Sequence, residues 1–160
     1  MIVRGITSMK EIERLQKYLL LIRRSVGWTA SEFGDRIGVT RQTINNLESG
    51  RSKLTKTQYI AIRSVLDAEM NKYPSETKML GLILEVFVDN PQKYNSQKKQ
   101  ELLEKANMLT PSILAGTSDR KSVSDTFLLA AKILGFVMPI LPLLIDGMSI
   151  WLKNLTQDDD

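Results

Sequence analysis

The sequence predicts an all-α protein, and three local signals support this fold class. Apolar residues recur at intervals of three and four along most of the chain, which is the spacing of amphipathic helices. Two capping boxes mark helix starts, T-x-x-E from Thr29 and T-x-x-Q from Thr55. Gly27 and Gly38 stand where helices should end, because glycine accepts the positive φ of a helix C-terminus.

The composition bounds the chemistry that the chain can perform. At 160 residues it is long enough for a modest core without covalent cross-links, and it contains neither cysteine nor histidine. These absences remove disulfides, thiolate nucleophiles, the usual zinc ligands and the usual general base at neutral pH. We therefore expect a protein that is not an enzyme and that uses no cofactor or metal. The opening residues are too few and too polar for a secretory signal, so we expect a cytoplasmic location.

The positive charge is concentrated in the N-terminal half. Residues 1–75 carry 13 lysines and arginines against 7 acidic residues, whereas residues 76–160 carry 9 against 11. The first half therefore has a net charge of +6 within an overall charge of +4. Charge of this sign attracts a phosphate backbone through counterion release, although a solvated helix face is also often basic.

Four helices are expected in the first 71 residues. Residues 10–26 form the first, with an apolar stripe at Ile12, Leu15, Leu19, Ile22 and Val26. The second is short, begins after Thr29 and ends at Gly38, and the fourth spans residues 56–71. Residues 1–8 show no clear period, so a short strand, an arm and loose chain all remain open for them.

The third predicted helix, over residues 40–49, presents polar side chains opposite an apolar face. Thr40 is placed to cap it, and Ile44 and Leu47 should be buried. Its outer face comprises Arg41, Gln42, Thr43, Asn45 and Asn46. In the major groove of DNA, arginine pairs bidentately with guanine and glutamine with adenine, so this face has the chemistry of a base-reading helix.

The second half is expected to contain further helices. One spans residues 76–89 and is ended by Asn90-Pro91, and a weaker one covers residues 102–109. Glu85 and Asp89 lie four residues apart on the first of these, and we interpret them as a solvated helix face, not as a catalytic pair.

The last segment, residues 122–153, is very hydrophobic. The run ILGFVMPILPLLI from residue 133 is unbroken, and the apolar stretch reaches back to Phe127 if one lysine is tolerated. That length, roughly 19 residues, is enough to span a bilayer. Pro139 and Pro142 disfavour a long soluble helix, whereas membrane helices tolerate prolines more readily.

Two interpretations of this segment are open. In the first, residues 127–152 associate with the membrane as a transmembrane helix, with Trp151 and Lys153 as interfacial anchors. Arg120 and Lys121 would then place the N-terminal part at the inner face of the cell membrane. In the second, the segment is a helical hairpin that is bent at the prolines and buried in a dimer. We favour the membrane, because the later half has no polar face left for water.

Turn and core residues follow an ordered pattern in WTASEFGDRIGVTRQTINNLESGR. The pattern has a small residue at Gly34, a turn at Gly38, inward positions at Ile37, Ile44 and Leu47, and a closing L-E-x-G. Residues 11–70 thereby resemble the Cro and lambda-repressor type (XRE-like) of helix-turn-helix regulators, which are prokaryotic and phage DNA-binding proteins. We therefore expect a helix-turn-helix bundle over 9–73, a helical connector and candidate dimerisation region over 75–115, and the hydrophobic segment over 122–153.

The resemblance also implies which side chains contact DNA. Matched position by position, the groove-facing residues are Thr40, Arg41, Gln42, Thr43 and Asn46. Arg51 and Lys53 match the loop that holds the sugar-phosphate chain. One position departs, because the family usually has glutamine where this chain has Ala30. We expect the nearby hydroxyl of Thr29 to contact DNA in place of that glutamine.

Arg23 and Glu48 match a pair that some family members join as a partly buried ion pair, which would fix the orientation of two helices. The leading interpretation is a sequence-specific transcriptional regulator that binds double-stranded DNA as a homodimer; the sequence indicates no effector. The alternative is a protein-interaction module with the same fold, either antitoxin-like or a membrane adaptor.

Overall fold

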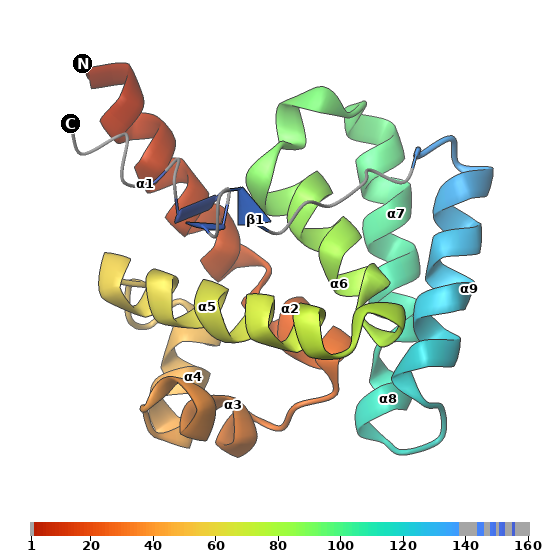
Figure 1. The fold of residues 1–160 in the computed structure, drawn as a ribbon, viewed down its shortest axis with the longest axis horizontal. Coiled ribbons are helices and arrows are strands. Elements are labelled where there is room, and N and C mark those ends of the chain that lie inside the picture. Colours follow the sequence, from red (N-terminus) through yellow and green to blue (C-terminus); the bar gives the residue numbers. More distant parts are fainter. Residues whose placement is uncertain (1, 138–143, 146–147, 150, 153–154, 156–160) are drawn as a thin grey trace.

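A computed structural model describes residues 2–137, 144–145, 148–149, 151–152 and 155, and its fold is almost wholly helical (Figure 1). The N-terminal part consists of α1 (Ile2–Lys17), α2 (Leu19–Val26), α3 (Ala30–Ile37), α4 (Arg41–Ser49) and α5 (Lys56–Lys72). The short helices on either side of Gly38 and the helix after Thr55 are therefore where the capping signals predicted them. Residues 2–8, part of the stretch that the sequence left open, begin α1.

The helix predicted over residues 10–26 is divided at Tyr18. Tyr18 leaves helical geometry, with φ −104° and ψ 13°. Backbone bonds nevertheless continue across it, since its amide donates to Arg14 O at 3.2 Å and the Ile22 amide donates to Tyr18 O at 2.9 Å. The division is thus a bend between α1 and α2. At the bend, the Tyr18 ring lies 5.1 Å from the ring of Phe87.

The second half consists of short helices joined by 3₁₀ turns. Its helices are α6 (Lys78–Ile83), a π-helix (Leu84–Asp89), α7 (Ser96–Leu109), α8 (Pro111–Leu114) and α9 (Arg120–Ile133). The helix predicted over 76–89 therefore begins two residues later than expected and changes its winding at Leu84. In the π-helix each bond spans five residues, as between the Asn90 amide and Glu85 O at 2.9 Å.

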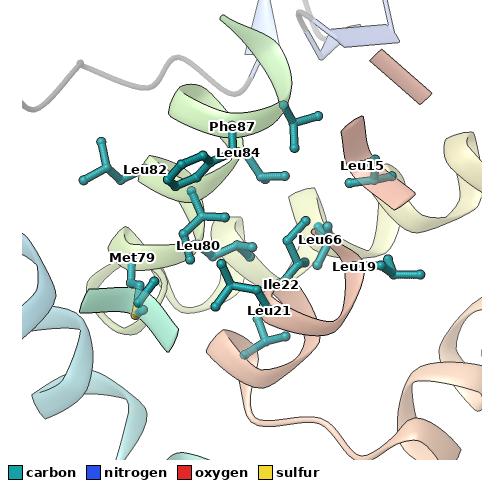
Figure 2. Close-up of a cluster of buried hydrophobic side chains, with 14 of the residues drawn as sticks. Leu15, Leu19, Leu21, Ile22, Leu66, Met79, Leu80, Leu82, Leu84 and Phe87 are labelled. Atoms are coloured by element: carbon teal, nitrogen blue, oxygen red, sulfur yellow. The ribbon is translucent and has the colours of Figure 1, made fainter. Parts of the chain in front are cut away.

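Both halves of the chain share one hydrophobic core. Leu15, Leu19 and Ile22 from α1 and α2 meet Leu66 of α5 and a series of side chains from α6 and the π-helix (Figure 2). Almost every residue of the latter series is buried: Met79, Leu80, Leu82, Ile83, Leu84, Val86, Phe87 and Val88. Burial of apolar surface on this scale is the main stabilising contribution to such a fold. The predicted division of the chain into units over 9–73, 75–115 and 122–153 stays a prediction.

A buried ion pair joins α5 to the π-helix. Arg63, whose side chain is 4% exposed, binds Asp89 bidentately, with Nη1 to Oδ1 at 2.6 Å and Nη2 to Oδ2 at 3.0 Å. Glu85 accepts hydrogen bonds from the Asn90 side chain and from the Tyr94 hydroxyl. The interpretation of Glu85 and Asp89 as a solvated face was therefore wrong. The partner of Asp89 comes from α5, 26 positions earlier, whereas the partners of Glu85 follow within nine positions.

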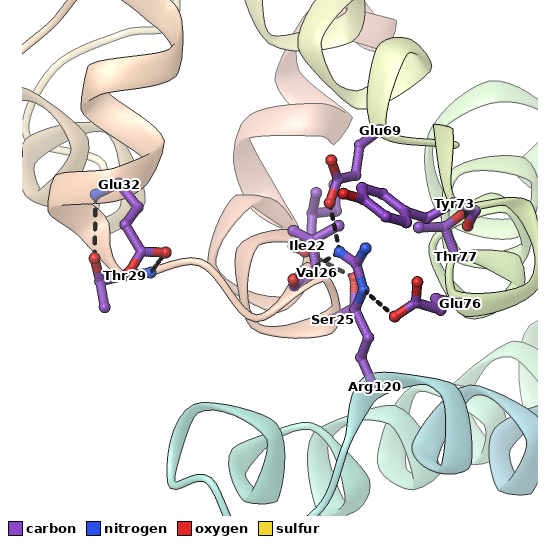
Figure 3. A network of polar contacts seen from close by, with 10 residues as sticks. All are labelled: Ile22, Ser25, Val26, Thr29, Glu32, Glu69, Tyr73, Glu76, Thr77 and Arg120. Carbon is purple, nitrogen blue, oxygen red and sulfur yellow. Dashed lines mark hydrogen bonds and ion pairs between the residues drawn. The ribbon is translucent and has the colours of Figure 1, made fainter. Parts of the chain in front are cut away.

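Arg120, at the start of α9, connects the second half to the first (Figure 3). Its guanidinium contacts the carboxylates of Glu69 and Glu76 and donates to the carbonyl of Val26 at 3.2 Å, where α2 ends. It also lies 4.9 Å from the centre of the Tyr73 ring. We expected Arg120 to be the basic flank of a membrane segment. The structure instead makes it an inter-helix contact with a side chain only 14% exposed.

The hydrophobic segment does not form the helix expected over 122–153. Helix α9 ends at Ile133, and Gly135 follows with φ +96°. Two-residue strands, β1 (Leu144–Ile145) and β2 (Met148–Ser149), then pair antiparallel. Among the described residues, none of the helices has the length and apolar character needed to cross a membrane. The rest of the run, with Pro139, Pro142 and the predicted anchor Lys153, falls outside those residues.

Trp151, the other predicted membrane anchor, packs against α5. It is buried, its indole Nε1 donates to Asp67 Oδ2 at 2.6 Å, and its ring meets Tyr59 edge-on at 5.9 Å. A buried indole is stable only when its N–H finds an acceptor, and Asp67 provides one. The assignment of Trp151 to a lipid interface was therefore wrong.

Candidate nucleic-acid interface

The turn between α3 and α4 depends on two glycines. Gly38 has φ +78°, the left-handed conformation that ends α3. Gly34 is buried, and a Cβ added to it would lie 2.6 Å from the carbonyl oxygen of Val39. Its hydrogen therefore lets the chain return directly over α3, where the Val39 amide donates to Gly34 O at 2.9 Å. The predicted need for a small residue at this position is confirmed.

Helix α4 is held by its cap and by its apolar face. The Thr43 amide donates to Thr40 Oγ1 at 3.1 Å, as the sequence predicted. Ile44 and Leu47 are 0% and 1% exposed, so they fix the rotation of the helix about its axis. Arg41, the first residue of the helix, stays exposed.

Three candidate DNA contacts form a chain along the outer face of α4. Gln42 Nε2 donates to Asn46 Oδ1 at 3.0 Å, and Arg51 Nη1 reaches the same oxygen at 3.5 Å. The Asn46 oxygen is thus occupied within the protein, whereas its amide hydrogens and the Gln42 oxygen are available to an outside partner. The arrangement orients donors and acceptors before any ligand arrives.

Gln16 of α1 holds the loop that follows α4. Its Nε2 donates to Leu47 O at 2.9 Å and Ser52 O at 2.6 Å, and its Oε1 accepts from the Leu54 amide at 2.9 Å. All three bonds reach backbone groups more than 30 residues away. Sequence reasoning missed this residue because a glutamine on a helix gives no local sign of such a role.

The predicted pair between Arg23 and Glu48 forms. Arg23 Nε lies 2.6 Å from Glu48 Oε2 and Nη2 lies 3.0 Å from Oε1, with side chains 11% and 8% exposed. Arg23 also donates to the carbonyl of Trp28 at 3.0 Å. Glu48 is the one acidic residue between 41 and 51, and this pairing turns its charge inward. The outer face of α4 is left with polar and basic side chains.

The start of α3 has the predicted capping box. The Glu32 amide donates to Thr29 Oγ1 at 3.1 Å, and the Thr29 amide donates to the Glu32 carboxylate at 3.4 Å (Figure 3). The Thr29 hydroxyl is thereby engaged in capping. Ala30 has no polar side chain, and Arg36 in the last turn of α3 lies over the Trp28 ring at 4.2 Å. The helix is anchored here by packing and capping.

The predicted contact residues differ in how closely the structure groups them. Thr40 and Thr43 share a hydroxyl contact of 3.0 Å, and Gln42, Asn46 and Arg51 form the chain described above. Lys53 is exposed in the loop after α4. In the described part of the chain, no hydrogen bond joins Thr29 or Lys53 to these side chains.

Comparison with known proteins agrees with this geometry. Residues 19–72 match the helix-turn-helix family. Antitoxin HipB of Escherichia coli (strain K12) is 31% identical over 75 residues, which cover 43% of this chain and 85% of that protein. The chain belongs to the helix-turn-helix family of the Cro and lambda-repressor type. No solved structure matches it significantly.

Membership places the family's motif on α3 and α4 of this helix-turn-helix protein. The matched residues begin at the start of α2 and end with α5, so α1 and the whole second half lie outside them. Gln16 and Arg120, which bond to groups within the matched part, lie outside these residues.

Proposed function

We propose that this protein is a transcriptional regulator that binds double-stranded DNA sequence-specifically and inserts α4 into the major groove. Support comes mainly from one observation: Arg41 and Gln42 are exposed at the start of a helix whose opposite face, Ile44 and Leu47, is completely buried. In the known mode of this motif, the N-terminal residues of the second helix contact base edges. Thr40, Thr43 and Asn46 extend the same surface.

The loop after α4 has a separate role in this proposal. Arg51 and Lys53 are exposed cations in the segment that Gln16 holds, and they bind phosphates. Thr29, at the start of α3, adds a further polar contact to the backbone. Phosphate contacts set affinity and its salt dependence, whereas base contacts set sequence preference.

The proposal is tested by selecting a preferred duplex from a random pool and titrating it by fluorescence anisotropy. Arg41→Ala with Gln42→Ala should remove sequence preference, because each bidentate contact contributes about 1–3 kcal/mol of discrimination. The matched control is Lys98→Ala with Gln97→Ala, which removes a cation and an amide from the exposed face of α7. Unchanged preference in the first variant would refute the assignment of α4.

The phosphate residues have a different signature in the same assay. Arg51→Ala with Lys53→Ala should weaken binding to all duplexes alike and reduce the slope of log K against log salt by about 2.

We further propose a homodimer, for which half-sites should lie about 34–36 Å apart. Inserting half a helical turn between half-sites should then abolish tight binding.

A second candidate function is favoured by the likeness to antitoxin HipB. In this alternative the helix-turn-helix protein is an interaction module that neutralises a partner protein. Strong retention of a protein partner, together with no duplex binding at low salt, would favour this alternative over the DNA-binding regulator.

A further inference from the structure

An open cleft of about 250 Å³ lies between the bend after α1 and one face of α7. Arg14, Lys17 and Tyr18 line one side, Lys99 and Leu103 line the other, and Phe87 of the π-helix contributes to the wall. This volume lies just below the roughly 300–1,000 Å³ of pockets for drug-sized ligands, so it suits a single-ring compound better.

The charge of the cleft is one-sided. Arg14, Lys17 and Lys99 line it, and none of the described residues that line it is acidic. Arg14 Nε donates to Val88 O at 2.7 Å and Lys99 Nζ donates to Pro91 O at 2.8 Å, so backbone carbonyls position both cations without neutralising them. None of the three belongs to an ion pair within the described residues. The ammonium of Lys17 lies 5.4 Å from the centre of the Tyr18 ring, so cationic and aromatic groups are neighbours in this cleft.

The apolar part of the cleft is aromatic. The rings of Tyr18 and Phe87 lie 5.1 Å apart at 40°, and Leu103 adds an aliphatic side chain. Aromatic surfaces of this kind favour stacking or edge contacts with another ring. The lining therefore offers an aromatic surface and cationic groups within one small volume.

We propose that this cleft is a binding site for a small aromatic carboxylate, with the ring against Tyr18 and Phe87 and the carboxylate toward Arg14, Lys17 and Lys99. Guanidinium and ammonium donors make charge-assisted bonds to carboxylates, which are stronger than neutral ones. Tyr18 forms the bend after α1, and Gln16, two residues earlier, holds the loop of Arg51 and Lys53. A bound ligand thus contacts the same helical turn that positions the candidate DNA loop.

The test uses benzoate as the probe and amide chemical shifts of the full chain as the readout. Saturable shifts around Tyr18 and Leu103 are expected at millimolar benzoate. Benzyl alcohol, which lacks the charge, and acetate, which lacks the ring, should each bind at least about tenfold more weakly. Absence of saturation at about 10 mM benzoate, or equal binding of acetate, would overturn the proposal.

Variants locate the site. Lys17→Gln with Lys99→Gln should raise the Kd for benzoate by about tenfold or more, whereas Lys98→Gln with Lys105→Gln, on the exposed surface of α7, should leave it unchanged. Wild-type affinity in the first variant would refute the assignment. Any effect of benzoate on duplex binding rests on the proposed function and is measured separately by anisotropy. The benzoate titration therefore stands even if no duplex binds.

Discussion

Replacing Glu11 with glutamine should change how the stability of this protein depends on pH. Glu11 lies on α1 and is only 7% exposed. Burial, together with the nearby charge of Asp89, raises the pKa of its carboxyl from 4.5 to about 7, against the opposing charges of Arg63 and Arg14.

The sign follows from proton linkage. The folded state binds this proton more tightly than the unfolded chain, so the stabilisation is complete below pH 4.5 and is lost as the pH rises through about 7. A pKa raised by this amount corresponds to about 3 kcal/mol of unfolding free energy. Glutamine cannot ionise, so Glu11→Gln should retain that stabilisation at all pH values.

Urea unfolding followed by circular dichroism at about pH 5 and pH 8 measures the effect. The wild type should lose stability between the two values, and Glu11→Gln should lose much less. The chain has no histidine, so no side chain with an ordinary pKa near 6.5 complicates this interval. Glu13→Gln, an exposed carboxyl on the same helix, is the matched control and should follow the wild type. Parallel profiles for wild type and Glu11→Gln would refute the reasoning.

Two further substitutions test packing contacts by the same unfolding measurement. Gly34→Ala should lower the free energy of unfolding by about 1–3 kcal/mol, because the new Cβ would meet the backbone oxygen of Val39 at 2.6 Å; an unchanged value would mean that the α3–α4 turn is not closely packed. Trp151→Phe keeps a ring but removes the hydrogen bond to buried Asp67, and should cost about 1.5–3 kcal/mol. A neutral result there would place Trp151 away from α5 in solution.

The motif was predictable because its signals are local. The capping boxes at Thr29 and Thr55 each lie within four residues, and the structure contains both. Glycine is needed at Gly34 because Val39 O lies too close for a Cβ, and at Gly38 because φ is positive, and both requirements arise within a few residues of chain. The pair of Arg23 and Glu48 is not local, and only the family resemblance indicated it. The DNA contacts themselves stay a prediction.

Contacts between distant residues account for most of what the sequence could not reveal. Arg120 bonds to a carbonyl 94 positions away, and Gln16 to one 31 positions away. Both are ordinary polar residues on helices, so no periodicity or motif distinguishes them from solvated neighbours. The prediction for Trp151 was wrong for a related reason: a tryptophan beside an apolar run suits a lipid interface and a protein core equally well.

The winding of the π-helix Leu84–Asp89 determines the direction in which later residues point. Its bonds span five residues, so it accommodates one residue more than an α-helix would between the same flanking turns. If the same six residues took α-helical winding instead, everything beyond them would rotate by about 100°. Asp89 would then turn away from Arg63, leaving a buried guanidinium without its carboxylate. The winding of this segment is consequently under stricter constraint than most of its side chains.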